Sequence, residues 1–135
     1  MEGRYRLELG LHLEPPADVP TRIAALWGDA LLAHHQAEDR VAKKCADELH
    51  ALGSQHADTA ALRHAATIHA MVAIGQQQPV IALSRFEDAL RLAHRAGDDW
   101  LVTTSLLNVG LGQLNTDCLQ AARSTLAEAI SRTNA

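Results

Sequence analysis

Residues 80–96 read VIALSRFEDALRLAHRA, and this stretch is the clearest amphipathic segment of the chain. Apolar side chains recur in it every third or fourth residue, the spacing that places them on one face of an α-helix. They are Ala82, Leu83, Phe86, Ala89, Leu90 and Ala93. The charged side chains of Arg85, Asp88 and Arg91 fall on the opposite side. The segment is therefore predicted to be a surface helix that packs on a core through one face only.

Pro, Gly and Asn-Asp clusters divide the rest of the chain into similar segments. The apolar spacing predicts helices at about 21–36, 39–52, 60–74, 80–96, 100–114 and 118–131. We expect Thr21 to cap the first of these helices and Asp99 to cap the fifth. The helices pair into three antiparallel hairpins, at about 21–52, 60–96 and 100–131. Alternating apolar residues at 5–13 suggest a strand, but a single strand has nothing to pair with, so we interpret this segment as an N-terminal helix.

An internal repeat links the hairpins. Ala82, Phe86 and Ala89 are spaced four and then three apart, and the same spacing recurs once further along the chain and once before it. The corresponding residues are Ala122, Leu126 and Ala129, and Ala42, Ala46 and Leu49, so the interval from one set to the next is constant. One period at two successive intervals indicates a solenoid. Gly110, which precedes Ala122 by about three helical turns, predicts a place where two helices approach closely.

Residues 86–93 (FEDALRLA), followed by Gly97 and Asp98, resemble the second-helix signature of the long tetratricopeptide repeats found in LuxR-type, MalT-like ATP-dependent transcriptional regulators. Residues 107–111 (LNVGL) are similar to the start of the next first helix, and residues 3–8 (GRYRLE) to a second helix that precedes the first hairpin. The resemblance covers nearly the whole chain. It implies an all-α fold in one domain over residues 1–135, a right-handed superhelix of about three helix–turn–helix repeats plus an N-terminal helix.

Two positions depart from the repeat pattern. Gln77 and Gln78 replace the usual Gly-Asp turn, and Ala46 stands where a large residue is expected. The first repeat is therefore expected to pack loosely or to shift its register.

The resemblance also implies a function. In such regulators a nucleotide-binding region and a helix-turn-helix flank the repeats, but this chain has no Gly-rich phosphate loop ending in Lys-Ser or Lys-Thr. The chain is thus expected to be a non-catalytic segment of a regulator that binds a protein, a peptide or an inducer. The alternatives are a helical sensor that binds a small molecule, and a stand-alone scaffold fragment without activity of its own.

The first helix of each such repeat lines the concave face, and this placement identifies candidate binding residues. They are Trp27, Leu31, His34, His64, Thr67, Met71, Ile74, Thr104, Leu107 and Leu111. Together they would form an apolar groove with a few polar side chains, suited to an amphipathic helix or an extended peptide. Trp27 and Met71 are expected to contribute most, because aromatic residues and Met are favoured at binding surfaces. The alternative is that these side chains only pack between the helices of a short stack.

Composition and charge exclude several other classes of protein. The chain has 135 residues, of which 47% are hydrophobic and 21% charged, values typical of a globular domain. The formal net charge is -4 and no basic stripe is present, which argues against direct binding of nucleic acid. Because we find no long apolar run and no signal peptide, we expect a cytoplasmic protein without a membrane span.

Catalytic, metal and cofactor sites are not expected either. The eight histidines lack the spacing of metal ligands, and the acidic residues fall at predicted turns and wet helix faces. Cys45 and Cys118 are interpreted as buried small apolar residues. An enzyme would need several titratable side chains at inward positions, and those positions are nearly all apolar here.

The ends of the predicted stack suggest self-association. A solenoid needs a capping element with a polar outer face, yet the last helix still carries Leu119, Leu126 and Ile130. We therefore expect a homo-oligomer, formed through exposed apolar ends, in addition to a protein or peptide partner.

Overall fold

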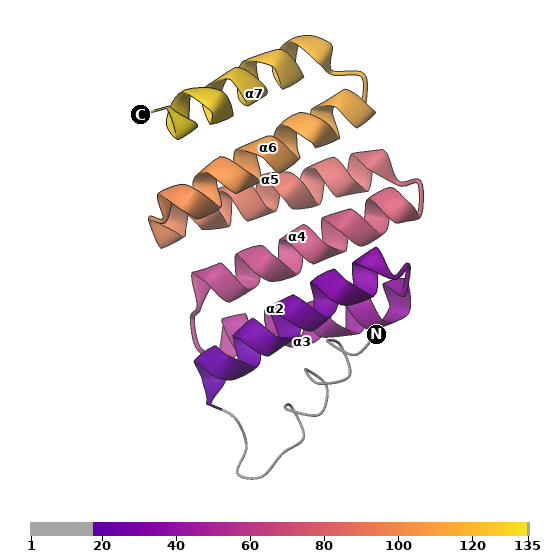
Figure 1. The fold of residues 1–135 in the computed structure, drawn as a ribbon, viewed down its shortest axis with the longest axis vertical. Helices are drawn as coiled ribbons and strands as arrows, with labels where there is room; N and C mark the ends of the chain where they lie inside the picture. Colours follow the sequence, from indigo (N-terminus) through magenta and orange to yellow (C-terminus); the bar gives the residue numbers. More distant parts are fainter. Residues whose placement is uncertain (1–17, 135) are drawn as a thin grey trace.

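The computed structural model describes residues 18–134, which form six α-helices that follow one another as antiparallel neighbours (Figure 1). They are α2 (Val19–His35), α3 (Asp39–Gln55), α4 (Thr59–Gly75), α5 (Pro79–Ala96), α6 (Asp99–Asn115) and α7 (Leu119–Thr133). The predicted all-α repeat fold is confirmed, and the part of the chain described contains no strand. The helix expected at residues 5–13 lies outside the described residues.

The repeat is more regular than the side-chain pattern alone indicated. The six helices begin at positions 19, 39, 59, 79, 99 and 119, so that one helix and its turn always take the same length of chain. Each turn contains one residue with a left-handed backbone, and these residues recur at the same interval. They are Ala37, Ala57, Gln77, Gly97 and Asp117. Gly97 is the one whose lack of a Cβ suits that conformation.

Side-chain caps occur on every second helix, so they recur at twice the interval of the turns. Asp18, Asp58 and Asp98 precede the first helices of the three hairpins, and each carboxylate accepts a hydrogen bond from a backbone N–H of the first turn. The second helices are preceded by Glu38, Gln78 and Cys118, none of which caps through its side chain. The backbone N–H of each of these three residues donates to a carbonyl five residues earlier, as that of Asp58 also does, and this bond closes the preceding helix.

The two expected caps are therefore wrong by a few residues. Thr21 does not cap α2, because its N–H donates to the Asp18 carboxylate at 2.8 Å, and Pro20 lies inside the helix. Proline is tolerated in a first turn, where the N–H has no partner within the helix. Asp98 rather than Asp99 caps α6.

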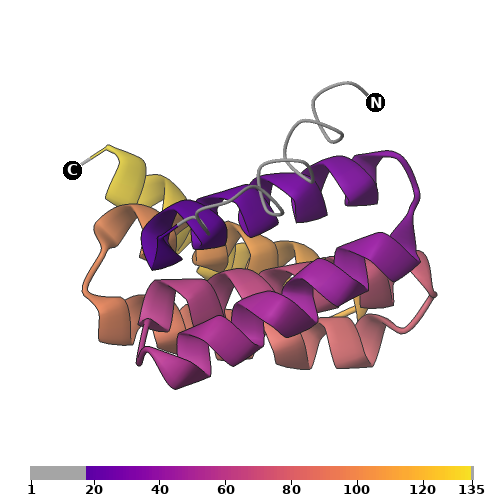
Figure 2. The same ribbon diagram turned by 90° about the horizontal axis from the view of Figure 1, so that it is seen from below.

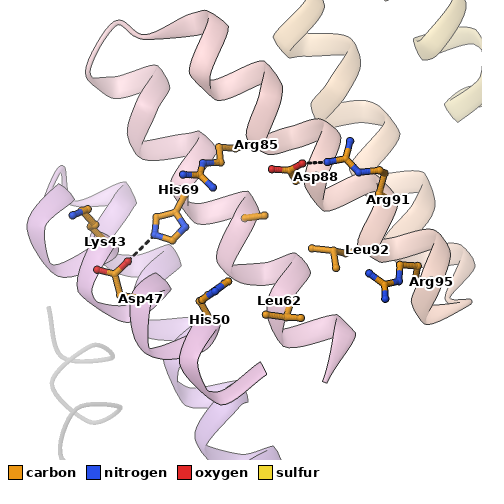
Figure 3. A pocket seen from close by; sticks show the side chains of 11 residues that line it. Lys43, Asp47, His50, Leu62, His69, Arg85, Asp88, Arg91, Leu92 and Arg95 are labelled. Carbon is orange, nitrogen blue, oxygen red and sulfur yellow. Dashed lines mark hydrogen bonds and ion pairs between the residues drawn. The ribbon is translucent and has the colours of Figure 1, made fainter. Parts of the chain in front are cut away.

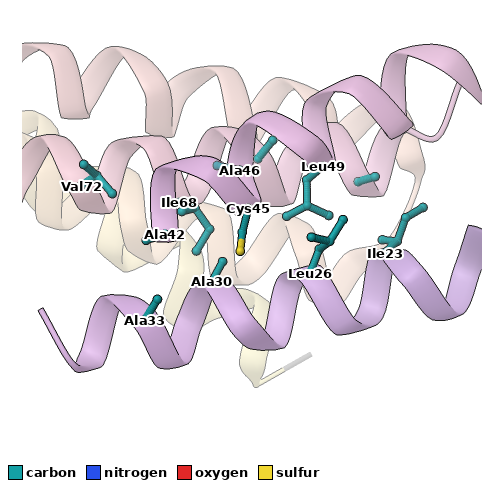
Figure 4. Packing of buried hydrophobic residues seen from close by; sticks show 12 residues of the cluster. Ile23, Leu26, Ala30, Ala33, Ala42, Cys45, Ala46, Leu49, Ile68 and Val72 are labelled. Atoms are coloured by element: carbon teal, nitrogen blue, oxygen red, sulfur yellow. The ribbon is translucent and has the colours of Figure 1, made fainter. Parts of the chain in front are cut away.

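The largest core cluster joins α2, α3 and α4 and is built of small and medium side chains (Figure 4). Ala46 is fully buried in it, although a larger residue was expected there. Leu49 and Ile68 are also fully buried, and the view shows Ile68 of α4 directed at α2 and α3. Ile68 of the neighbouring hairpin thus completes the core of the first repeat. Helix α3 begins at the same interval as the other helices, so its register is not shifted.

The helices form two faces. The first helix of the first hairpin, α2, lies in a different layer from its partner α3 (Figure 2). Consecutive helices pack along their length, and α2 also packs on α4. No Cα atom of α4 lies within 8 Å of one in α6, and the same holds for α3 and α5. The backbones of α4 and α6, and those of α3 and α5, are therefore too far apart to touch directly.

Helix α7 packs closely on α6 at Gly110, as predicted. A Cβ placed on Gly110 would lie 2.5 Å from Cδ2 of Leu126, so the leucine fits only against a residue without a side chain. Among the described helices, none combines the length and the apolar character needed to cross a bilayer.

Candidate functional site

The ten side chains expected to bind a partner all lie on the first helices of the hairpins, α2, α4 and α6. We call the surface that they share the first-helix face. Ile74, Leu107 and Leu111 are 38%, 40% and 52% exposed, which is high for large apolar residues. Thr67 is buried, and its hydroxyl donates to the backbone carbonyl of Arg63 at 2.9 Å, so it offers nothing to a ligand.

The remaining six are partly buried. Leu31 and Met71 pack against the core cluster, and the Nδ1 atom of His34 is buried without a hydrogen-bond partner among the described residues. Trp27, His64 and Thr104 come together around one further side chain, which the sequence pattern did not single out.

Trp27 of α2 and His64 of α4 stack on one another. Their ring centroids are 4.2 Å apart and their planes are inclined by 21°. The stack bridges two helices that also pack against one another. Both rings remain partly accessible, so the stack presents an aromatic edge on the first-helix face.

Arg63 is the residue that the sequence pattern missed. Its side chain is only 4% exposed and spans the interval between α4 and α6. Nε donates to Ser105 Oγ at 3.1 Å, and Nη2 donates to Thr104 Oγ1 at 3.0 Å. Nη1 lies 3.3 Å from His64 Nδ1, and the guanidinium carbon stands 5.8 Å from the Trp27 ring centroid, within the range of a cation–π contact.

Among residues 18–134, the charged guanidinium of Arg63 has only neutral hydrogen-bond partners. Within the described part of the chain, no carboxylate forms an ion pair with it, and Asp98 acts on it only from a distance. Burial lowers the pKa of Arg63 because the charged form loses solvation, and the charge of Asp98 opposes this effect. A guanidinium has five N–H groups, and two of these have no partner among residues 18–134.

His64 is held in its neutral form by the same surroundings. Burial is the main cause that lowers its pKa to about 4, the nearby charge of Arg63 lowers it further, and Asp58 acts in the opposite direction. Since Nη1 of Arg63 donates to Nδ1, the neutral ring carries its proton on Nε2. Arg63 and His64 therefore both offer N–H donors, and the cluster suits a ligand that brings acceptor oxygens.

A signal for this cluster was present in the sequence. Arg63 and His64 interrupt the apolar run of residues 60–66, and a lone arginine at an inward position needs polar partners. The partners are Thr104 and Ser105, about one repeat further along the chain. Their pairing depends on the distance between α4 and α6, which the sequence does not specify.

The structure also locates the other candidate groups. Within residues 18–134 no three His, Cys, Asp or Glu side chains are grouped so as to hold a metal ion. Cys45 is buried as predicted, and its thiol donates to Asp29 Oδ2 at 3.3 Å. Cys118 is exposed at the start of α7, so its predicted burial is wrong.

Comparison with known proteins adds no further assignment. No protein-family model, curated protein or solved structure matches this chain.

Proposed function

We propose that the chain is a non-catalytic, tetratricopeptide-like interaction segment that binds a protein or peptide partner on its first-helix face. The observation that carries this proposal is the cluster of Trp27, His64, Arg63 and Thr104, which brings aromatic surface and unpaired N–H donors together from three helices. The exposed leucines of α6 lie on the same face. A bound segment would place acceptor oxygens near Arg63 and apolar side chains on these leucines.

The absence of catalysis is part of this proposal. Buried positions in residues 18–134 are occupied mainly by Ala, Leu, Val and Ile, and the buried polar side chains are Asp29, Arg63, Thr67 and Ser105. The pKa values of Arg63 and His64 are both shifted against the charged form. The hydroxyls beside Arg63, those of Thr104 and Ser105, accept hydrogen bonds from the guanidinium, and neither is hydrogen-bonded to a general base among the described residues. Such a cluster is suited to recognition rather than to proton transfer.

We propose a role in a LuxR-type, MalT-like transcriptional regulator on the basis of the sequence resemblance alone. In that setting the segment would transmit binding of a partner or inducer to regions outside this chain. Self-association through the exposed ends of the stack belongs to the same proposal. A helical sensor for a small molecule is the alternative.

Selection from a random peptide library displayed on phage tests the binding face. Selected peptides should carry at least one acidic residue and several apolar ones. Leu111→Glu should weaken their binding about tenfold, because it sets a charged side chain against the apolar side chains of the peptide, which would have to remove it from water. Ile81→Glu is the matched control, since Ile81 is 50% exposed but lies on α5, a second helix.

Arg63→Met gives a second readout in this experiment. It should abolish the preference for acidic peptides while keeping an apolar side chain inside the stack. Equal losses for Leu111→Glu and Ile81→Glu would contradict binding on the first-helix face. Selection of no peptide, together with stabilisation of the chain by a small molecule, would favour the sensor.

A further inference from the structure

A hollow lies away from the first-helix face, between the second helices α3 and α5 (Figure 3). It has a volume of about 690 Å³, and α4 forms its floor. We call it the α3/α5 groove. The side chains of α3 and α5 that line it are mostly charged, whereas Leu62 and Ala66 of α4 and Leu92 of α5 supply apolar surface.

The α3/α5 groove carries a surplus of positive charge. Four of its side chains are lysine or arginine and two are aspartate. Both aspartates are already engaged: Asp47 Oδ1 lies 2.9 Å from His69 Nε2, and Asp88 pairs with Arg91. Lys43, Arg85 and Arg95 form no ion pair with any described residue. This surplus stands in a chain whose formal net charge is -4.

The repeat itself does not require these cations. One repeat further along the chain, the positions equivalent to Lys43, Arg85 and Arg91 hold Leu83, Thr125 and Ser131. The later repeats therefore fold with neutral residues at these sites. The cations serve no common packing role, which makes a ligand the better explanation.

The hollow also depends on one small residue. Ala66 stands in the floor of the groove, and its equivalent in the next repeat is Leu106, which is buried in the core of the last hairpin. A leucine at the position of Ala66 would occupy part of the space that is open here. Charge and shape of the α3/α5 groove are thus both departures from the repeat pattern.

The arrangement of the charges points to an elongated ligand. Arg85 and Arg95 are ten residues apart on α5, which places them about 15 Å apart along the helix. Figure 3 shows the cationic side chains spread along the groove and not gathered around one point. A single phosphate would need converging donors. An amphipathic helix can instead lay its apolar side on Leu62, Ala66 and Leu92 and direct acidic side chains to both walls.

We propose that the α3/α5 groove is a docking site for an acidic amphipathic helix of a partner protein, about ten residues long. The site is separate from the first-helix face, so one chain can hold two partner segments at once. This inference does not depend on binding at the first-helix face.

Fluorescence anisotropy with a designed probe tests the proposal. The probe is a fluorescein-labelled peptide of about ten residues, with leucine at every third or fourth position and glutamate between. The control probe has lysine in place of each glutamate. The full chain should bind the glutamate probe and not the lysine probe, and added salt should weaken the binding.

Variants of the chain test whether the probe binds in the α3/α5 groove. Arg85→Glu should weaken binding about tenfold, because it sets a like charge against the probe. Arg123→Glu makes the same change of charge at an exposed site on α7 and should leave binding unaltered. Ala66→Leu should weaken binding without any change of charge, and circular dichroism with thermal melting checks that each variant is folded.

Three results would overturn the proposal. One is that the glutamate probe does not bind the wild-type chain. Another is that Arg123→Glu weakens its binding as much as Arg85→Glu does. The third is that heparin or ATP, added as competitors, bind the groove more tightly than the probe, which would make it a site for polyanions or nucleotides.

Discussion

The lowered pKa of His64, on the first-helix face, predicts how the stability of the chain depends on pH. The pKa of His64 falls from 6.5 to about 4 on folding, mainly through burial. Above pH 6.5 the ring is neutral in both the folded and the unfolded chain, so it has no effect. Below that pH the unfolded chain binds a proton that the folded chain resists, and the free energy of unfolding falls until about pH 4.

Urea denaturation between these pH values measures this effect. The loss from His64 alone should be about 3 kcal/mol when the proton is fully bound. His64→Gln should be less stable than wild type at neutral pH, since it loses the stack on Trp27, but its stability should change less with pH. His94→Gln, at an exposed position on α5, is the control and should keep the wild-type pH dependence. An unaltered pH dependence in His64→Gln would show that other groups cause it.

At the scale of elements, the turns are the weak points of the repeat. A left-handed backbone costs a residue with a Cβ about 1 kcal/mol, and the turn after α4 places Gln77 there with φ 59°. Gln77→Gly should raise the free energy of unfolding by about 0.5 kcal/mol, because relief of this cost exceeds the added entropy of the unfolded chain. Gly97→Ala should lower it by about 1 kcal/mol, although no atom lies within 4 Å of the added methyl group.

The neighbouring Gln76 provides the control for these variants. Its φ is -89°, so glycine relieves no strain there and only makes the unfolded chain more flexible. Gln76→Gly should therefore leave stability unchanged or lower it. Chemical denaturation of all three variants compares them directly, and equal effects at positions 76 and 77 would contradict the role of the left-handed turn.

For the whole molecule, periodicity made the fold predictable from the sequence. The spacing shared by Ala82, Phe86 and Ala89 recurs in every hairpin, and the observed helices begin within a few residues of the expected positions. The caps were harder to place, since Asp98 and Asp99 are both suitable and Pro20 resembles a break. The backbone geometry determines which of two adjacent residues caps a helix, and the residue types alone do not.

The binding surfaces were only partly predictable. Trp27, His64 and Thr104 were expected on one face, and the structure brings them together around Arg63. The bonds from Arg63 to α6 depend on the separation of two helices, which no local pattern specifies. The α3/α5 groove was missed because it arises from a small residue, Ala66, where the next repeat has Leu106. Such a hollow becomes visible only when successive repeats are compared position by position.

The outer end of the stack carries the last prediction, which concerns self-association. Leu119 and Ile130 of α7 are 64% and 58% exposed, and α7 is the terminal helix of the described stack (Figure 1). Leu126, expected at the same surface, is partly buried, with its side chain beside Gly110 of α6. A glutamate at position 126 would therefore disturb packing inside the chain, which makes Leu119 and Ile130 the better sites for a test.

Light scattering on the double variant Leu119→Glu, Ile130→Glu measures whether this surface joins two copies of the chain. The wild-type chain should be a dimer and the variant a monomer. The glutamates introduced at positions 119 and 130 would lose their hydration if the interface formed, which is unfavourable for a charged side chain. Val80→Glu, Ile81→Glu makes the same change at two exposed apolar residues of α5 and should leave the dimer intact. A wild-type chain that stays monomeric at its highest soluble concentration would mean that α7 needs no partner. The first-helix face and the α3/α5 groove would then be the surfaces on which to seek one.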